Sequence, residues 1–337
     1  MDNINILVTG GCGFIGSNFI HYMLSKYPYN IINLDKLTYA GNLENLKDIE
    51  DDKRYTFIKG DIINKSDLEK VFEKNIDMVV NFAAESHVDR SIIDPDTFIK
   101  TNINGTFNLL EIAKKKEVKK FIQISTDEVY GSLGKEGKFK EDTPLAPNSP
   151  YSASKTSADM LAMAYYKTFN TPVIITRCSN NYGPYQFPEK LIPLIISNAL
   201  ENIELPVYGD GMNVRDWIHV LDHCAGIDTV LHKGALGNVY NIGGESEKTN
   251  IEIVKLILDI LGKPHSLIKY VKDRPGHDRR YAIDQTKIKN ELGHQTRNSF
   301  EKGMEDTVKW YVENRSWWER IKSGAYLEYY DMMYKNR

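Results

Sequence analysis

The stretch GGCGFIG, residues 10–16, lies between an apolar run and a segment with helical periodicity. Gly10, Gly13 and Gly16 allow a tight turn, let the backbone approach a pyrophosphate, and let the following helix pack close to the sheet, while the helix N-terminus favours negative charge. Asp35 closes the next apolar run, roughly 20 residues later, where a carboxylate binds the adenosine ribose hydroxyls and repels a 2′-phosphate. Together these features favour an NAD-binding βαβ unit over an ordinary strand–helix turn, and NAD over NADP.

Short β-branched runs alternate with helical patterns through the first half of the chain. Apolar runs of this length, separated by about ten or more residues of helical periodicity, indicate βαβ units and a parallel sheet covered on both faces. We therefore expect an α/β fold with a doubly wound parallel (Rossmann) sheet. Its predicted strands are INILV (4–8), IINLD (31–35), YTFIKGD (55–61), DMVVNFAA (77–84), KFIQIS (120–125) and PVIITRC (172–178).

After about residue 180 the pattern changes to loops with proline and glycine, short apolar stretches and helices such as IEIVKLILDILG (251–262). Ligands of doubly wound sheets bind at the carboxyl ends of the strands. We expect residues 1–180 to form an NAD-binding domain that carries the catalytic residues. Residues 181–337 should form mainly a smaller α/β lobe that binds the substrate.

The composition favours small-molecule partners. Among 337 residues, 43 basic and 46 acidic side chains give a net charge of −3, which argues against nucleic acid or an anionic membrane as a partner. No apolar run approaches the ~20 residues that span a bilayer, and MDNINILVTGG lacks the features of an export signal. The three cysteines (Cys12, Cys178, Cys224) form no CxxC pair. We expect a cytoplasmic protein without a metal site or disulfide.

STDEVYG, residues 125–131, places Asp127 and Glu128 side by side where the apolar run FIQI (121–124) should end as a buried strand. Two carboxyl groups whose pKa values are separated can serve as a general acid and a general base. Acids at a strand end can also face solvent or cap a turn. Spacing alone does not separate these interpretations.

YSASK, residues 151–155, places Tyr151 and Lys155 four residues apart, on one face of an expected helix. An ammonium group near a phenol stabilises the phenolate, lowers the tyrosine pKa and makes the tyrosine a usable base near neutral pH. A surface Tyr and Lys at helical spacing is the alternative interpretation, which the nucleotide-binding context disfavours.

These motifs resemble the extended short-chain dehydrogenase/reductase family. RDWIHVLD (215–222), NFAAESHVDRS (81–91) and NNYGPYQFPEKLIP (180–193) extend the resemblance over nearly the whole chain, in particular to the members that remove water from a nucleotide-linked glucose. Members that epimerise C4 are similar in the glycine loop and in YxxxK, but carry small hydroxyl residues in place of Asp127 and Glu128. The resemblance therefore favours a dehydratase, which is a hydro-lyase.

The resemblance implies a role for each residue of the chemical site. Tyr151 removes the O4 proton while hydride leaves C4 for NAD, and Lys155 holds the phenolate and the cofactor ribose. Thr126 hydrogen-bonds near O4, Glu128 removes the C5 proton, and Asp127 protonates the departing 6-hydroxyl. Hydride then returns to C6, which gives a 4-keto-6-deoxy sugar and regenerates NAD.

The resemblance also implies two sets of binding residues. The expected NAD contacts, besides Tyr151 and Lys155, are Gly10, Gly13, Phe14, Ile15, Gly16, Asp35, Lys36, Leu37, Thr38, Asp61, Ile62, Phe82, Ala83, Ala84, Glu85, Ser86, Thr101 and Asn181. The expected nucleotide-sugar contacts are Ser86, Thr126, Asn180, Lys190, Leu191, Pro206, Val207, Tyr208, Arg215, Asn250, Asp273, Arg274, Pro275, Gly276 and His277. Guanidinium groups match pyrophosphate oxygens, so Arg215 and Arg274 are the best supported of these substrate contacts on physical grounds. His277 is the least supported.

Three alternatives stay open at this point. A C4 epimerase, or a dehydratase of another nucleotide sugar such as UDP-glucose, shares the fold, and an NAD-binding regulator would have lost the tyrosine or the lysine. Thymine and uracil differ by a methyl group worth ~1–3 kcal/mol. The choice of thymidine, as in dTDP-glucose, and of L-rhamnose synthesis as the pathway rests on the resemblance.

The resemblance further implies a homodimer through a four-helix bundle. The contributing helices should begin near Thr101 and Tyr151. Their expected apolar faces carry Ile103, Phe107 and Leu110 on one helix and Met160, Leu161 and Ala164 on the other.

Overall fold

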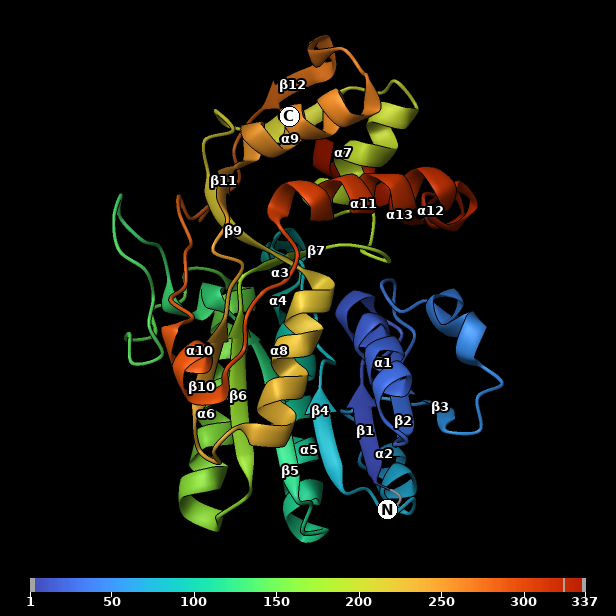
Figure 1. Ribbon diagram of the computed structural model, residues 1–337, viewed down its shortest axis with the longest axis vertical. Helices are drawn as coiled ribbons and strands as arrows, with labels where there is room; N and C mark the ends of the chain where they lie inside the picture. Colours follow the sequence, from blue (N-terminus) through green and yellow to red (C-terminus); the bar gives the residue numbers. More distant parts are fainter. Residues whose placement is uncertain (1–3, 324, 335–337) are drawn as a thin grey trace.

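The computed structural model describes residues 4–323 and 325–334. A large lobe built on a parallel sheet lies below a smaller lobe of helices and short strands, and the carboxyl ends of the sheet strands face the junction between the two (Figure 1). This arrangement places the ligand-binding edge of a doubly wound sheet under a second layer of chain.

The large sheet has seven strands in the order β10-β6-β5-β4-β1-β2-β3, and all its pairs are parallel. The six strands predicted from the sequence are confirmed: β1 (Asn5–Thr9), β2 (Asn30–Asp35), β3 (Tyr55–Lys59), β4 (Met78–Asn81), β5 (Lys120–Thr126) and β6 (Val173–Cys178). The seventh, β10 (Val239–Ile242), was not predicted, because four residues carry too little pattern.

Side chains alternate between two cores, one on each face of the sheet. Along β1, Ile6 and Val8 belong to the core that the sheet shares with α1, α8 and α10, whereas Leu7 belongs to the core on the opposite face, with α2, α5 and α6. Strands buried on both faces read as near-continuous apolar runs, and that property made them visible in the sequence.

The helices of the large lobe begin and end at identifiable signals. Ser149 caps α6 reciprocally with Ser152, Pro150 occupies its first turn, and Asn170 ends it in the left-handed conformation. The helices and turns of this lobe are α1 (Phe14–Lys26), η1 (Leu43–Ile49), α2 (Lys65–Phe72), α3 (Val88–Ile93), α4 (Pro95–Phe98), η2 (Ile99–Gly105), α5 (Thr106–Lys115), η3 (Asp127–Tyr130), α6 (Pro150–Phe169), α8 (Val220–Lys233) and α10 (Thr286–Leu292).

Helices α4, η2 and α5 follow one another without a break, and η2 is a π-helical segment. The expected start of a helix near Thr101 is therefore wrong, because helical structure already begins at Pro95. Leu110, expected on an exposed apolar face, is fully buried in the core instead. Phe107 and Met160 do lie on the surface, with 39% and 61% of their area exposed.

The smaller lobe contains two short sheets and the C-terminal helices. Its elements are β7 (Asn180–Tyr182), α7 (Leu191–Leu200), β8 (Leu205–Tyr208), β9 (Val214–His219), β11 (Glu247–Thr249), α9 (Asn250–Leu261), η4 (His265–Leu267), β12 (Ile268–Val271), α11 (Phe300–Glu313), α12 (Arg315–Ile321) and α13 (Ala325–Tyr334). The predicted helix at 251–262 corresponds to α9, which ends at Gly262 in the left-handed conformation. Strand β10 and helix α8 come from beyond residue 180 but belong to the large sheet and its helix layer, so the division at 180 stays a prediction.

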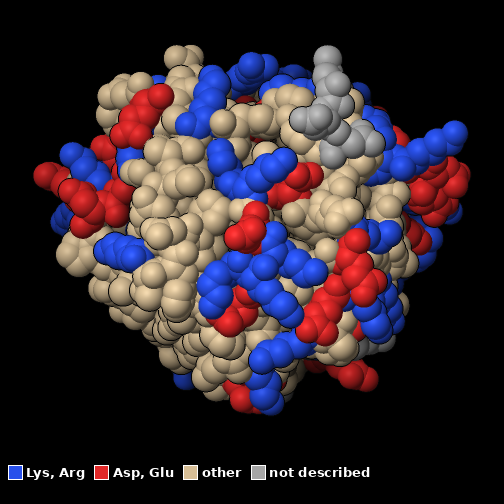
Figure 2. All heavy atoms as spheres, turned by 90° about the horizontal axis from the view of Figure 1, so that it is seen from below, with Lys and Arg blue, Asp and Glu red and all other residues tan. Residues whose placement is uncertain are grey.

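Basic and acidic side chains are interspersed on the face seen from below (Figure 2), in keeping with the net charge of −3. Of the helices in the described part of the chain, none has the length and apolar character needed to cross a membrane.

Candidate active site

A cavity of about 310 Å³ lies at the carboxyl ends of the strands. It is lined by the glycine loop, the ends of β2, β4, β5 and β6, the start of α6 and the loop that follows β7. The volume is in the range of small-molecule sites. The cavity brings together all the expected NAD contacts except Leu37, all five expected catalytic residues, and Ser86, Asn180 and Lys190 of the expected substrate contacts.

The glycine loop has the close approaches that a dinucleotide site requires. Gly10 has φ +70°, and a Cβ there would lie 2.7 Å from the backbone nitrogen of Ala83. A Cβ at Gly16 would lie 2.4 Å from the carbonyl oxygen of Gly10. Since Gly13 and Phe14 at the start of α1 both line the cavity, the loop and the helix N-terminus fit a pyrophosphate.

Asp35 ends β2 with its carboxylate held in place. One oxygen accepts the Cys12 backbone N–H at 2.9 Å and the other accepts the Leu37 N–H at 2.8 Å. Burial raises the pKa of Asp35, and these two bonds oppose the rise. Leu37 has φ +58° and does not line the cavity, so it supports Asp35 rather than the cofactor directly. Lys36 pairs with Asp61 at 2.8 Å.

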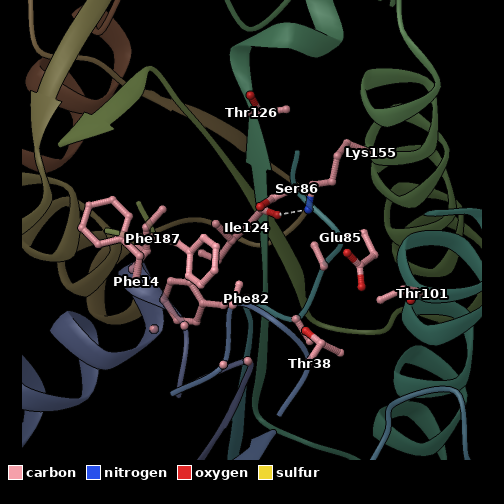
Figure 3. A pocket seen from close by; sticks show the side chains of 18 of the residues that line it. Phe14, Thr38, Phe82, Glu85, Ser86, Thr101, Ile124, Thr126, Lys155 and Phe187 are labelled. Carbon is pink, nitrogen blue, oxygen red and sulfur yellow. Dashed lines mark hydrogen bonds between the residues drawn. The ribbon is translucent and has the colours of Figure 1, made fainter. Parts of the chain in front are cut away.

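Aromatic and polar side chains occupy different sides of the cavity. Phe14, Phe82 and Phe187 gather on one side, whereas Glu85, Thr101 and Lys155 lie on the other (Figure 3). The sequence analysis missed part of this lining, which comes from strand ends, from loops without a motif and from the segment 180–193: Leu34, Ala40, Gly41, Gly60, Ile124, Ser125, Cys178, Ser179, Gln186, Phe187 and Glu189. The signal that could have found the last three is the segment NNYGPYQFPEKLIP itself, from which only Asn180, Asn181, Lys190 and Leu191 were selected.

The acids of STDEVYG lie on a short helical turn at the end of β5. Thr126 begins this turn, and its hydroxyl accepts the Glu128 backbone N–H at 3.3 Å. The Thr126 hydroxyl also donates to one oxygen of Asp127 at 3.3 Å. The second oxygen of Asp127 is buried and has no hydrogen-bond partner in the described part of the chain. The acids therefore face the cavity instead of capping a turn at the surface.

The surroundings of the two acids differ. Burial, the neighbouring Glu128 and then Asp216 raise the pKa of Asp127 well above its ordinary value. Burial also raises the pKa of Glu128, but the charges of Arg274, Arg215 and Lys190 oppose that rise. The arrangement therefore favours a proton on Asp127 and a negative charge on Glu128, which are the states of a general acid and a general base.

Tyr151 and Lys155 lie on the first turns of α6, and both side chains are buried. The Lys155 ammonium donates to the Ile124 carbonyl oxygen at 2.6 Å (Figure 3). Burial and the negative charge of Glu128 raise the pKa of Tyr151 well above its ordinary value, and a hydrogen bond with Thr126 opposes the rise. The expected lowering of the Tyr151 pKa is therefore not seen here, because burial and Glu128 raise it, and the role of Tyr151 as a base stays a prediction.

Basic side chains approach Glu128 from the smaller lobe. The Lys190 ammonium donates to the Ser86 carbonyl oxygen at 2.9 Å. The Arg215 guanidinium lies over the Tyr281 ring, 4.4 Å from its centre. Arg274 pairs with Asp89 at 3.2 Å and keeps a buried Nε without a partner in the described chain. These cations suit a pyrophosphate beside the acids.

The other expected substrate contacts do not line this cavity. They lie on the smaller lobe, at β8, β9, the starts of α7 and α9, and the loop after β12: Leu191, Pro206, Val207, Tyr208, Arg215, Asn250, Asp273, Arg274, Pro275, Gly276 and His277. His277 pairs with Asp273 at 2.6 Å, and burial together with Arg274 lowers its pKa to about 4. Its imidazole is therefore neutral near pH 7.

Comparisons with known proteins place this geometry in a family. Residues 7–307 match the profile of the GDP-mannose 4,6 dehydratase family. A dTDP-glucose 4,6-dehydratase of Xanthomonas campestris pv. campestris (strain B100) is 51% identical, over 95% of this chain and 96% of the relative.

Two solved structures agree with this match. The dTDP-glucose 4,6-dehydratase of Bacillus anthracis str. Ames, in complex with NAD, has a TM-score of 0.89 and 59% identity over 95% of this chain and all of the other. That of Streptomyces venezuelae, also with NAD bound, has a TM-score of 0.93 and 49% identity, again over 95% of this chain and all of the other. This chain, with its glycine loop, paired strand-end acids and YxxxK helix, belongs to the dTDP-glucose 4,6-dehydratase family of short-chain dehydrogenases/reductases.

Proposed function

We propose that the protein dehydrates dTDP-glucose to dTDP-4-keto-6-deoxyglucose with NAD as a cofactor that is regenerated in each turnover. The observation that carries this proposal is the pair Asp127 and Glu128, which lie in one cavity with Tyr151 and Lys155 and have surroundings that separate their protonation states. A C4 epimerase needs no acid for a leaving hydroxyl, whereas elimination of water does.

Each side chain has a task that its position supports. Tyr151 takes the O4 proton, and the adjacent Thr126 hydroxyl supports O4. Lys155, one turn further along α6, supplies the positive charge that favours the phenolate as it forms. Glu128 takes the C5 proton, which the C4 ketone makes acidic, and Asp127 protonates the departing 6-hydroxyl.

When bound, NAD would supply the group that takes the hydride from C4 and gives it back to C6. The glycine loop and the N-terminus of α1 would hold its pyrophosphate, and Asp35 its adenosine ribose. The half-buried Phe14, Phe82 and Phe187 would exclude water from their side of the cavity (Figure 3).

The test is incubation with dTDP-glucose, followed by measurement of the alkaline absorbance of a 4-keto sugar. The 4-keto-6-deoxy product should form, and a deuterium at C4 of the substrate should reappear at C6. Formation of dTDP-galactose alone would indicate an epimerase, and no reaction with bound NAD would indicate a regulator. A parallel incubation with UDP-glucose tests the base, for which the family supports thymidine.

We propose that the physiological product is a precursor of L-rhamnose. The resemblance supports this pathway, and the 4-keto-6-deoxy sugar is the chemical intermediate that such a route needs. Coupled incubation with an epimerase and a reductase of that route should convert the product to dTDP-rhamnose.

We also propose a homodimer. Helices η2, α5 and α6 pack against one another and carry large exposed apolar side chains: Ile99, Phe107, Met160 and Phe169, with exposed fractions of 49%, 39%, 61% and 50%. A second copy would cover these side chains. Light scattering should give twice the monomer mass for the unmutated protein. The measured mass of Met160→Glu should be lower. A monomer at micromolar concentration would contradict this proposal.

We infer that the protein works in the cytoplasm. Cys12, Cys178 and Cys224 are free and buried thiols, and thiols persist in a reducing compartment. Cell fractionation with an antibody to the protein tests the inference.

A further inference from the structure

A buried polar network joins three parts of the catalytic site behind the cavity. Its members are Tyr130, Asp159, Arg177 and Asn241, with exposed fractions of 3%, 1%, 4% and 0%. We call these four residues the buried bridge. Sequence reasoning assigned no role to any of them.

Arg177 is the centre of the buried bridge. It lies on β6, where its register partners are Ser125 on β5 and Asn241 on β10. Its Nε donates to Asp159 at 2.9 Å, and its Nη1 donates to the Tyr130 hydroxyl at 3.0 Å. One guanidinium therefore holds two different elements against the same strand.

Tyr130 connects this guanidinium to the acid turn. It ends the helical turn that begins with Asp127 and Glu128. Its hydroxyl accepts from Arg177 and donates to Asn241 Oδ1 at 2.8 Å. Burial raises its pKa to about 12, so the hydroxyl keeps its proton. Asn241 is itself fixed, because its side-chain nitrogen donates to the Phe139 carbonyl oxygen at 3.1 Å.

Asp159 connects the same guanidinium to the redox pair. It lies on α6, four residues after Lys155 and eight after Tyr151, so the three buried side chains share one helix face. The Asp159 charge also favours the protonated form of Lys155, against the desolvation that disfavours it. The bridge therefore fixes both the position of α6 and the charge of its lysine.

We infer that Tyr130, Arg177 and Asp159 are positioning residues that set the distance between the elimination acids on the turn and the redox pair on α6. This inference rests on the proposed function. The two acids must meet C5 and O6 of a sugar whose C4 is held at Tyr151, and a misplacement of about 1 Å costs ~100-fold in rate. Of the three buried side chains on this short turn, Asp127 is itself one of the acids, so Val129 and Tyr130 remain to hold the turn in place.

The test variant is Tyr130→Phe, which removes only the hydroxyl, and the control is Tyr240→Phe. Tyr240 is also fully buried, neighbours Asn241 on β10 and bonds the Ala235 backbone N–H through its hydroxyl, but packs on the opposite face of the sheet. On mixing holoenzyme with dTDP-glucose, Tyr130→Phe should form reduced nicotinamide at close to the unmutated rate, while its overall turnover falls by about 10- to 100-fold, as for loss of a hydrogen bond to a charged group. Reduced nicotinamide should then accumulate, whereas Tyr240→Phe should not show this.

Asp159→Asn provides a second measurement. It should slow the formation of reduced nicotinamide itself, and move the alkaline limb of that step to lower pH, because Lys155 loses a neighbouring negative charge. Equal slowing of both steps in Tyr130→Phe, or no difference from Tyr240→Phe, would overturn the inference, as would an unchanged pH profile in Asp159→Asn. If the unmutated enzyme makes no 4-keto sugar, the proposed function fails instead.

Discussion

Asp35 and Asp127 are both buried aspartates at the carboxyl ends of strands of one parallel sheet, yet their carboxylates have different hydrogen-bond partners. Asp35 follows β2, and each of its oxygens accepts a backbone N–H. Asp127 follows β5, and one oxygen accepts only the Thr126 hydroxyl, at 3.3 Å. Its other oxygen has no partner in residues 4–323 and 325–334.

The difference shows what decides whether a strand-end acid binds or reacts. Two backbone N–H groups stabilise a negative charge and fix its position, which suits an acceptor for ribose hydroxyls. Asp127 has no such support and lies beside Glu128 and Asp216, so its charged form is disfavoured and it can donate a proton. One residue type thus serves as a ligand or as an acid, according to the hydrogen bonds that its surroundings supply.

The largest effect should come from the reacting acid. Asp127→Asn and Glu128→Gln should lower turnover by ~100- to 10,000-fold, as is usual for loss of a positioned acid or base. Both variants should still reduce bound NAD on addition of dTDP-glucose, since Tyr151 and Lys155 are intact. Tyr151→Phe should form no reduced nicotinamide. Absorbance spectra during a single turnover measure both quantities.

The Tyr151 variant is also the control for this experiment. If the two acid variants are as blocked in formation of reduced nicotinamide as Tyr151→Phe, then Asp127 and Glu128 do not act in the elimination. Exchange of the C4 deuterium with solvent in the unmutated enzyme would equally contradict a hydride that stays in the site.

Most of the fold could be predicted because its strands are buried on both faces. The core strands β1, β2, β4, β5 and β6 are mainly apolar runs, β3 is a half-buried edge strand, and the glycine loop fixes the first turn. Strand β10 and four strands of the smaller lobe, β7, β8, β11 and β12, could not be predicted, because three or four residues carry no period and their pairing is decided by contacts distant in sequence.

The residues of the candidate site could be predicted where they belong to a sequence motif. They could not be predicted where their role depends on contacts that form only in the folded chain. The glycine loop, Asp35, the acid turn and YxxxK all line one cavity as expected. The high pKa of Tyr151 was not foreseen, because it depends on burial and on Glu128, which only the folded chain brings close. The buried bridge has the same origin, since its four residues come from η3, α6, β6 and β10.

Removal of the binding acid should have a smaller effect than removal of the reacting one. Asp35→Ala should lower the affinity for NAD about 10- to 100-fold, because the hydrogen bonds between the Asp35 carboxylate and the ribose are lost. Discrimination against NADP should relax, since a repulsive charge also disappears. Titration with each cofactor, followed by fluorescence, measures these affinities, with the exposed Asp51→Ala as the control. An unchanged preference between NAD and NADP would show that Asp35 does not contact the adenosine ribose.

The pH dependence of turnover should depend on one acid and not on the other. Asp127 must be protonated to donate, so the rate should fall by about tenfold per pH unit above its raised pKa. Glu128 raises that pKa, so Glu128→Gln should move the alkaline limb of its residual activity to lower pH. Asp35→Ala, assayed at saturating NAD, should leave the limb in place. A limb that does not move in Glu128→Gln would show that it belongs to another group.

The smallest effect should be on stability, and it should have opposite signs at the two acids. The pKa of Asp127 is raised on folding, so there is no cost of burying its charge while the carboxyl is protonated in both states. As the pH rises above the ordinary pKa of an aspartate, only the unfolded chain releases the proton, and folding stability is lost.

Asp127→Asn should therefore stabilise the NAD-free protein at pH 7 by about 1–2 kcal/mol, and the gain should vanish near pH 3. Asp35→Asn should instead destabilise by about 1–3 kcal/mol, because an amide cannot accept both backbone N–H groups. Urea unfolding at the two pH values measures these differences, and a loss of stability in Asp127→Asn at pH 7 would mean that its carboxyl is satisfied in the folded protein.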